Sequence, residues 1–119
     1  MKELKVGIQL YSLRDELAKD MDATLKRVKE MGYDYVEFAG YYADKTAEEI
    51  KTLLDEIGLK VLSAHQGYEL FLEKGQEAFD YFKTYGVKYI AIPWLGSENL
   101  VGTPNWEKVK ADFIAVAKA

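Results

Sequence analysis

Five polar or aromatic side chains stand at the ends of strand-like stretches and carry groups that suit a small-molecule site. They are Gln9, Tyr11, Glu37, His65 and Trp94. A carboxylate and an imidazole held close together can move a proton, while amide, phenol and indole groups can bind a polyol. If the strands are parallel neighbours, all five side chains meet at one mouth. The sequence then predicts a polyol-binding pocket with proton-transfer capacity.

Each of these residues also has a purely structural interpretation. His65 is the only histidine of the chain, and a single histidine is often structural. Glu37 stands between two apolar residues, so it points away from the apolar, helix-packing face of its strand. An unpaired carboxylate there would be costly, which favours a functional role. Gln9 and Tyr11 could be interior residues with satisfied polar tips, and Trp94 could be a core or loop anchor.

The elements that would position these side chains are marked by three glycines. Helix-like stretches run into Gly32, Gly58 and Gly86, and a strand-like stretch follows each glycine directly. These junctions recur at intervals of 26 and 28 residues, the size of one βα unit. The sequence therefore predicts an α/β fold with a parallel sheet. Ligands of such folds bind beyond the carboxyl ends of the strands, where the longer βα loops gather.

The periodicity predicts four strands and four main helices. The strands are expected over Val6–Tyr11, Tyr33–Ala39, Leu59–Ala64 and Val87–Ile92, and the fourth, almost continuously apolar, is expected to be buried on both faces. The first and third helices are expected over Asp22–Met31 and Gln76–Tyr85. The second is expected to be capped by Thr46 and Glu49 and to end at Ile57, and the fourth to run from the N-cap Thr103 to about Ala117. A short helical turn is expected over Ser12–Lys19.

Composition limits the classes of protein to consider. The net charge of −4 and the scattered lysines and arginines argue against nucleic-acid binding. No apolar run reaches the roughly 18 residues of a membrane span, so no membrane partner is expected. The absence of cysteine leaves no disulfide framework and no thiolate metal site. A strand begins near Val6, which leaves no room for a signal peptide, and a cytoplasmic location is expected.

Three sequence blocks resemble a known family. They are VGIQLYSLRDEL at residues 6–17, MGYDYVE at residues 31–37 and SAH at residues 63–65. In this order they resemble the start of the sugar phosphate isomerases/epimerases of the xylose-isomerase-like TIM-barrel superfamily, and the resemblance covers the whole chain. It implies that residues 1–119 are a single N-terminal (βα)4 half of a (β/α)8 TIM barrel.

The resemblance also implies roles for the site residues. Glu37 and His65 would be catalytic, and Gln9, Tyr11 and Trp94 would bind a sugar or sugar phosphate. Intact relatives would transfer a proton next to a sugar carbonyl with a divalent metal, such as Mn, Mg, Co or Zn. Because the metal ligands of the family come mainly from later strands, we expect no metal site and no isomerase activity in this chain alone.

The open edges of a half-barrel predict a partner. We expect a homo-oligomer or a complementing C-terminal half. The alternative function is a non-enzymatic module that binds sugar or self-associates. The DNA-repair endonuclease branch of the superfamily fits less well, because the chain is acidic and lacks the metal-binding histidines. A flavodoxin-like sheet is the alternative fold, but the sequence contains no phosphate loop to support it.

Overall fold

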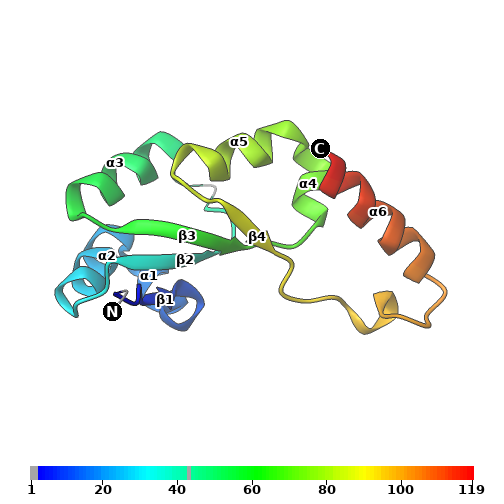
Figure 1. Ribbon diagram of the computed structural model, residues 1–119, viewed down its shortest axis with the longest axis horizontal. Helices are drawn as coiled ribbons and strands as arrows, with labels where there is room; N and C mark the ends of the chain where they lie inside the picture. The colour runs from blue at the N-terminus through cyan, green and yellow to red at the C-terminus, as the bar shows by residue number, and fades with distance from the viewer. Residues whose placement is uncertain (1–2, 43) are drawn as a thin grey trace.

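The computed structural model describes residues 3–42 and 44–119, which form a four-stranded parallel sheet with strand order β1-β2-β3-β4. The strands are β1 (Gly7–Gln9), β2 (Tyr35–Ala39), β3 (Lys60–His65) and β4 (Tyr89–Ala91). Neighbours in the sequence are also neighbours in the sheet (Figure 1). The predicted alternation of parallel strands with helices is confirmed.

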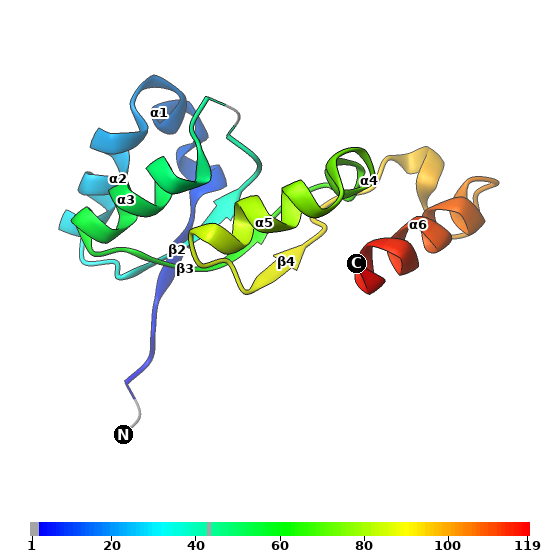
Figure 2. The ribbon, with the colours of Figure 1, turned by 90° about the horizontal axis from the view of Figure 1, so that it is seen from above.

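Helices cover one face of this sheet. The helical segments are η1 (Leu10–Leu13), α1 (Arg14–Lys19), α2 (Met21–Glu30), α3 (Ala47–Ile57), α4 (Glu69–Lys74), α5 (Gln76–Thr84), η2 (Ser97–Asn99) and α6 (Trp106–Lys118). Helices α2, α3 and α5 lie side by side along the same face of the strands (Figure 2). The core between them includes Leu25, Val36, Phe38, Ile50 and Phe82, each at most 1% exposed.

Helix α3 shows how the local sequence fixes an element and the strand after it. The Thr46 side chain accepts a hydrogen bond from the Glu49 amide at 3.1 Å, and the Glu49 carboxylate accepts one from the Thr46 amide at 2.7 Å. This is the predicted capping box. The helix ends at Gly58, whose φ of 83° is a left-handed conformation that glycine adopts without strain. The chain then enters β3 two residues later.

A change of register in the sheet aligns the polar face. The pairing of β2 with β3 shifts between Val36 and Glu37, so that Glu37 lies opposite Ser63, and Ala39 lies opposite His65. Buried residues on alternate positions, such as Phe38, face the helices. The intervening polar residues therefore share the other face, as predicted for Glu37.

The prediction for the fourth strand is wrong in length and in burial. Only Tyr89–Ala91 pair as β4, and the side chain of Tyr89 is 73% exposed. β4 is an edge strand, because no strand pairs with its far side within residues 3–42 and 44–119. Its apolar pattern suits a strand buried on both faces, but the face that carries Tyr89 is exposed.

The end of the chain also differs from the prediction. Helix α6 begins at Trp106 rather than near Thr103, whose hydroxyl instead donates to the carbonyl of Leu100 at 2.7 Å. The helix lies beside α4 and away from the sheet (Figures 1 and 2). Phe113 of α6 meets Tyr68 edge to face at 4.9 Å between ring centroids. Helix α4 was not predicted, because its six residues have no side-chain cap.

None of the helices in the described part of the chain is long and apolar enough to cross a membrane.

Candidate functional site

Three of the predicted site residues meet on the polar face of the sheet. Gln9 ends β1, Glu37 is central in β2 and His65 ends β3. The Gln9 amide nitrogen donates to Glu37 Oε1 at 2.8 Å and lies 3.0 Å from His65 Nδ1. Glu37 Oε1 is 3.1 Å from His65 Nε2. The parallel strands therefore bring an amide, a carboxylate and an imidazole into one hydrogen-bonded triad.

This geometry assigns the proton positions on the neutral ring of His65. Nε2 faces a carboxylate oxygen, which only accepts, so Nε2 carries the hydrogen and donates to Glu37. Nδ1 then accepts from the Gln9 amide, which has a second hydrogen for Glu37. The contacts of Glu37 with Gln9 and His65 and of Gln9 with Nδ1 then each pair a donor with an acceptor, while the longer approach of Gln9 Nε2 to His65 Nε2, at 3.3 Å, does not.

Ser63 completes the environment of Glu37. Its hydroxyl donates to Glu37 Oε2 in a short hydrogen bond. Hydrogen bonding by Ser63 is the largest effect on the carboxyl and lowers the pKa of Glu37 below its ordinary value. Burial opposes this shift, while the Gln9 amide and the charge of His65 support it. Glu37 is therefore held as an ionised carboxylate beneath His65.

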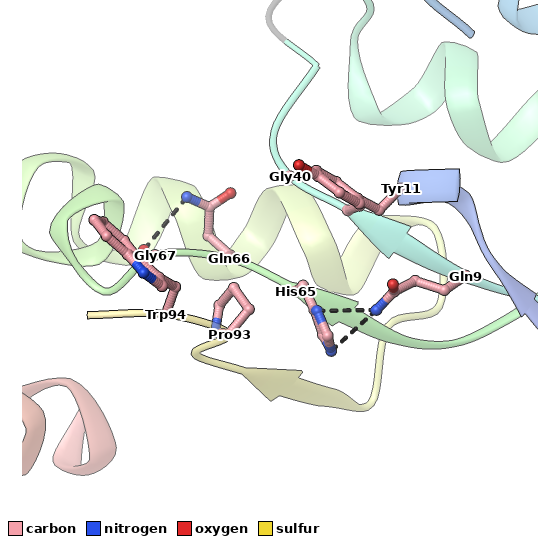
Figure 3. Close-up of a pocket in the computed structure, with 9 residues that line it drawn as sticks. Gln9, Tyr11, Gly40, His65, Gln66, Gly67, Pro93 and Trp94 are labelled. Atoms are coloured by element: carbon pink, nitrogen blue, oxygen red, sulfur yellow. Dashed lines mark hydrogen bonds between the residues drawn. The ribbon is translucent and has the colours of Figure 1, made fainter. Parts of the chain in front are cut away.

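A cavity of about 440 Å³ opens above the triad at the carboxyl ends of the strands (Figure 3). It is lined by Gln9, Tyr11, Ala39, Gly40, His65, Gln66, Gly67, Pro93 and Trp94. Four of the five predicted site residues are in this set. The fifth, Glu37, does not line the cavity but bonds directly to two residues that do. The structure thus brings all five predicted residues to one place.

Two aromatic side chains border the mouth of the cavity. Tyr11 is 57% exposed and Trp94 is 76% exposed, so both rings are accessible to a ligand. The Arg14 guanidinium lies 4.4 Å from the centre of the Tyr11 ring and donates to the Tyr11 carbonyl at 2.9 Å. Arg14 therefore fixes the ring of Tyr11 at the rim. The alternative placement of Trp94 in the core is wrong.

The side chains at this site do not complete a metal centre. Within residues 3–42 and 44–119, no three His, Asp or Glu side chains come together in a way that could hold a metal ion. The triad offers one carboxylate and one imidazole, whereas divalent cations of sugar enzymes take several such ligands. No chemical step is therefore derived through a metal on these residues.

Two crystal structures of sugar phosphate isomerase/epimerase proteins from Parabacteroides distasonis superimpose on nearly the whole chain. The first structure is 25% identical to this chain in sequence and superimposes with a TM-score of 0.67. The match covers 96% of this chain and 46% of the isomerase/epimerase chain. This chain resembles half of a sugar phosphate isomerase/epimerase. The second structure is 23% identical with a TM-score of 0.69, over 98% of this chain and 50% of the other.

The chain therefore spans about half the length of these sugar phosphate isomerase/epimerase structures. The resemblance found in the sequence and the parallel α/β half-barrel that it implied are confirmed. No protein-family model matches the chain, and no curated protein matches it.

Two residues next to the site, Ser63 and Gln66, are not among the five predicted site residues. Ser63 was not singled out, although it lies two positions before His65 on a strand and so shares its face. That alternation was the available signal. Gln66 directly follows His65 and also lines the cavity. Its Nε2 donates to the Gly67 carbonyl at 3.3 Å, and its buried Oε1 has no hydrogen-bond partner among the described residues.

Proposed function

We propose that this chain supplies the sugar-binding floor and the proton-transfer pair of a sugar or sugar phosphate isomerase/epimerase site. The observation that carries the proposal is the Gln9–Glu37–His65 triad beneath a cavity at the carboxyl ends of parallel strands. The half-length match to sugar phosphate isomerase/epimerase structures supports the substrate class. In parallel α/β folds this edge of the sheet is where ligands bind.

The cavity suits a small polar ligand. Its volume of about 440 Å³ falls within the roughly 300–1,000 Å³ of small-molecule sites. Exposed rings of Tyr11 and Trp94 can pack against the carbon–hydrogen face of a sugar, while Gln9 and His65 can bond to its hydroxyls. Tyr11, Trp94 and Gln9 are therefore proposed as substrate-binding residues.

His65 and Glu37 are proposed as the catalytic pair. His65 lines the cavity, and Glu37 fixes the hydrogen of the imidazole on Nε2. Nδ1 is then the basic nitrogen, and once a sugar displaces the Gln9 amide it can take the proton from the carbon next to the sugar carbonyl, leaving an enolate to which the proton returns at carbon. The Glu37 carboxylate stabilises the imidazolium that results.

The second candidate is a sugar-binding module without turnover. It is favoured by the environment of Glu37, because both carboxylate oxygens are already hydrogen-bonded within the chain. A carboxylate so fully engaged can be a purely structural anchor for Gln9 and His65. The two candidates share the cavity and its ligand class and differ in whether a proton moves.

The decisive experiment combines binding with proton exchange. The protein is titrated calorimetrically with aldoses, ketoses and their phosphates, with and without Mn²⁺ or Mg²⁺. Deuterium uptake from solvent at the carbon next to the sugar carbonyl is followed by NMR. Uptake that depends on the protein supports the enzyme, and binding without uptake supports the module.

The variants are His65→Gln, which should abolish exchange and weaken binding, and Glu56→Gln as the control on the exposed face of α3. Binding of no sugar or sugar phosphate under any condition would overturn both candidates. Equal losses of stability and binding in His65→Gln would assign His65 to structure only.

A further inference from the structure

A row of three polar side chains crosses the sheet beneath the cavity. Gln9 lies opposite Glu37 in the pairing of β1 with β2, and Ser63 lies opposite Glu37 in the pairing of β2 with β3. The Glu37 carboxylate accepts a hydrogen bond from each of them, at Oε1 from Gln9 and at Oε2 from Ser63. All three side chains come from neighbouring strands of the described sheet, so none of these contacts depends on what covers its edges.

This row exists because β3 carries one extra residue in its pairing with β2. Val36 pairs with Val61 but Glu37 pairs with Ser63, so Leu62 has no partner on β2. In a regular ladder Leu62 would lie opposite Glu37, and an apolar side chain cannot donate a hydrogen bond to a carboxylate. Irregularities of this kind re-aim side chains next to functional sites. Here the irregularity exchanges an apolar neighbour of Glu37 for a hydroxyl group.

The two oxygens of the Glu37 carboxylate have different partners. Oε2 accepts from the Ser63 hydroxyl, whereas Oε1 accepts from the Gln9 amide at 2.8 Å and lies 3.1 Å from His65 Nε2. The final torsion of a glutamate side chain has little preference of its own, so the partners orient the carboxylate. Ser63 occupies Oε2 and thereby leaves Oε1 for His65.

No basic side chain of the described residues takes over this task. Within residues 3–42 and 44–119, neither a lysine nor an arginine forms an ion pair with Glu37. Hydrogen bonding by Ser63 is also the largest effect on the pKa of Glu37, which it lowers. Ser63 is not among the residues that line the cavity, so it supports Glu37 from outside the ligand space.

We propose that Ser63 is a positioning residue for the proton transfer proposed above, on which this inference rests. Ser63 orients Glu37 so that Oε1 holds the imidazole hydrogen of His65 on Nε2 and Nδ1 stays free of hydrogen. The nitrogen of a histidine that carries the hydrogen is set by the hydrogen bonds of the ring. In the empty site the Gln9 amide also faces the ring (Figure 3). Once a ligand displaces that amide, the contact of Oε1 with Nε2 alone fixes the hydrogen.

The single histidine of the chain makes this hydrogen position measurable without a substrate. Nitrogen-15 NMR of the imidazole at about pH 9, well above the ordinary imidazole pKa of about 6.5, reports which nitrogen of the neutral ring is protonated. Wild type should show the Nε2–H form almost alone. Without the hydroxyl the carboxylate can turn, so Ser63→Ala should raise the population of the Nδ1–H form about tenfold, the effect of losing one hydrogen bond of ordinary strength.

A matched pair of variants separates the hydroxyl of Ser63 from its packing. Threonine and valine have nearly the same shape and both suit a strand, but only threonine can donate to Glu37. Ser63→Thr should therefore keep the wild-type hydrogen position, and Ser63→Val should reproduce the change seen in Ser63→Ala. Urea unfolding establishes that each variant is folded.

The deuterium-exchange assay supplies a second readout. Ser63→Val should lower the rate of exchange at saturating sugar about tenfold and leave the sugar affinity unchanged, because Ser63 does not line the cavity. If wild type binds sugar without exchange, the proposed enzyme fails, while the NMR measurement still decides the role of Ser63.

Three results would overturn the positioning role of Ser63. The first is an unchanged hydrogen position in both Ser63→Ala and Ser63→Val, or a mixture of the two forms in wild type. The second is an equal change in Ser63→Thr and Ser63→Val, which would assign the effect to packing. The third is unfolding of Ser63→Ala and Ser63→Val while Ser63→Thr stays folded, which would assign Ser63 to structure only.

Discussion

Replacing Glu37 by glutamine tests whether the charge of this carboxylate holds the triad together. The carboxylate accepts from Ser63, from Gln9 at 2.8 Å and from His65 at 3.1 Å. A carboxamide has the same shape and can keep these partners, because its oxygen can accept from Gln9 and His65 and its nitrogen can donate to Ser63. The substitution therefore removes the charge and little else.

The expected loss follows from the strength of these bonds. Hydrogen bonds to charged groups contribute about 1.5–3 kcal/mol and neutral ones about 0.5–1.5 kcal/mol, so each bond to Glu37 weakens by roughly 1 kcal/mol. The neutral side chain offsets part of this, because it costs less to desolvate at a site that is 29% exposed. We expect Glu37→Gln to lower the free energy of unfolding by about 1–2 kcal/mol at neutral pH.

The dependence on pH separates this account from a loss of packing. Because the pKa of Glu37 is lowered in the folded state, its ionised form stabilises the fold fully above the ordinary value of 4.5. That contribution disappears as the pH falls through the lowered pKa. The difference between wild type and Glu37→Gln should therefore shrink as the pH falls below about 5.

Urea unfolding followed by circular dichroism, at one protein concentration, measures both effects. Glu56→Gln makes the same chemical change on the exposed face of α3 and should cost less than about 0.5 kcal/mol. The reasoning is refuted if both variants lose equal stability at neutral pH. It is also refuted if the loss in Glu37→Gln is undiminished at about pH 3.

Three further predictions concern the scaffold. Thr46→Ala removes half of the capping box of α3 and should lower the free energy of unfolding by about 1 kcal/mol, measured from the urea midpoint. Phe82→Ala removes a side chain that is 1% exposed and should lower the free energy of unfolding by about 3–5 kcal/mol. The control Thr52→Lys, on the exposed face of α3, should leave that free energy unchanged. Burial raises the pKa of Tyr81 from 10.0 to about 12, so stability should fall as the pH rises above 10, and Tyr81→Phe should remove that part of the decline.

Features fixed by short stretches of sequence were predicted well. Helix α3 carries its own start at Thr46 and its own stop at Gly58, so no distant contact is needed to define it. The direction of the Glu37 side chain could also be predicted locally, because side chains alternate along a strand and the two neighbours of Glu37 are apolar. Parallel order then follows from the repeated βα units, and the convergence of Gln9, Glu37 and His65 follows from that order.

Features set by distant contacts were missed. The role of Ser63 depends on the register shift after Val36, which slides β3 past β2 until Ser63 faces Glu37. No local sequence pattern in β2 or β3 indicates that register shift. Helix α4 is similar, because its six residues are held by Phe71 packing on Phe79 and by the contact of Tyr68 with Phe113 rather than by a cap.

The error at β4 has a different origin. The sequence from Val87 to Ile92 has the composition of a strand buried on both faces, yet Tyr89 is 73% exposed and the strand has one neighbour among the described residues. Sequence pattern reflects the environment in which a chain functions, and an exposed apolar edge invites association. The contacts of the described residues do not supply that environment at β4, so composition alone could not predict the exposure of Tyr89.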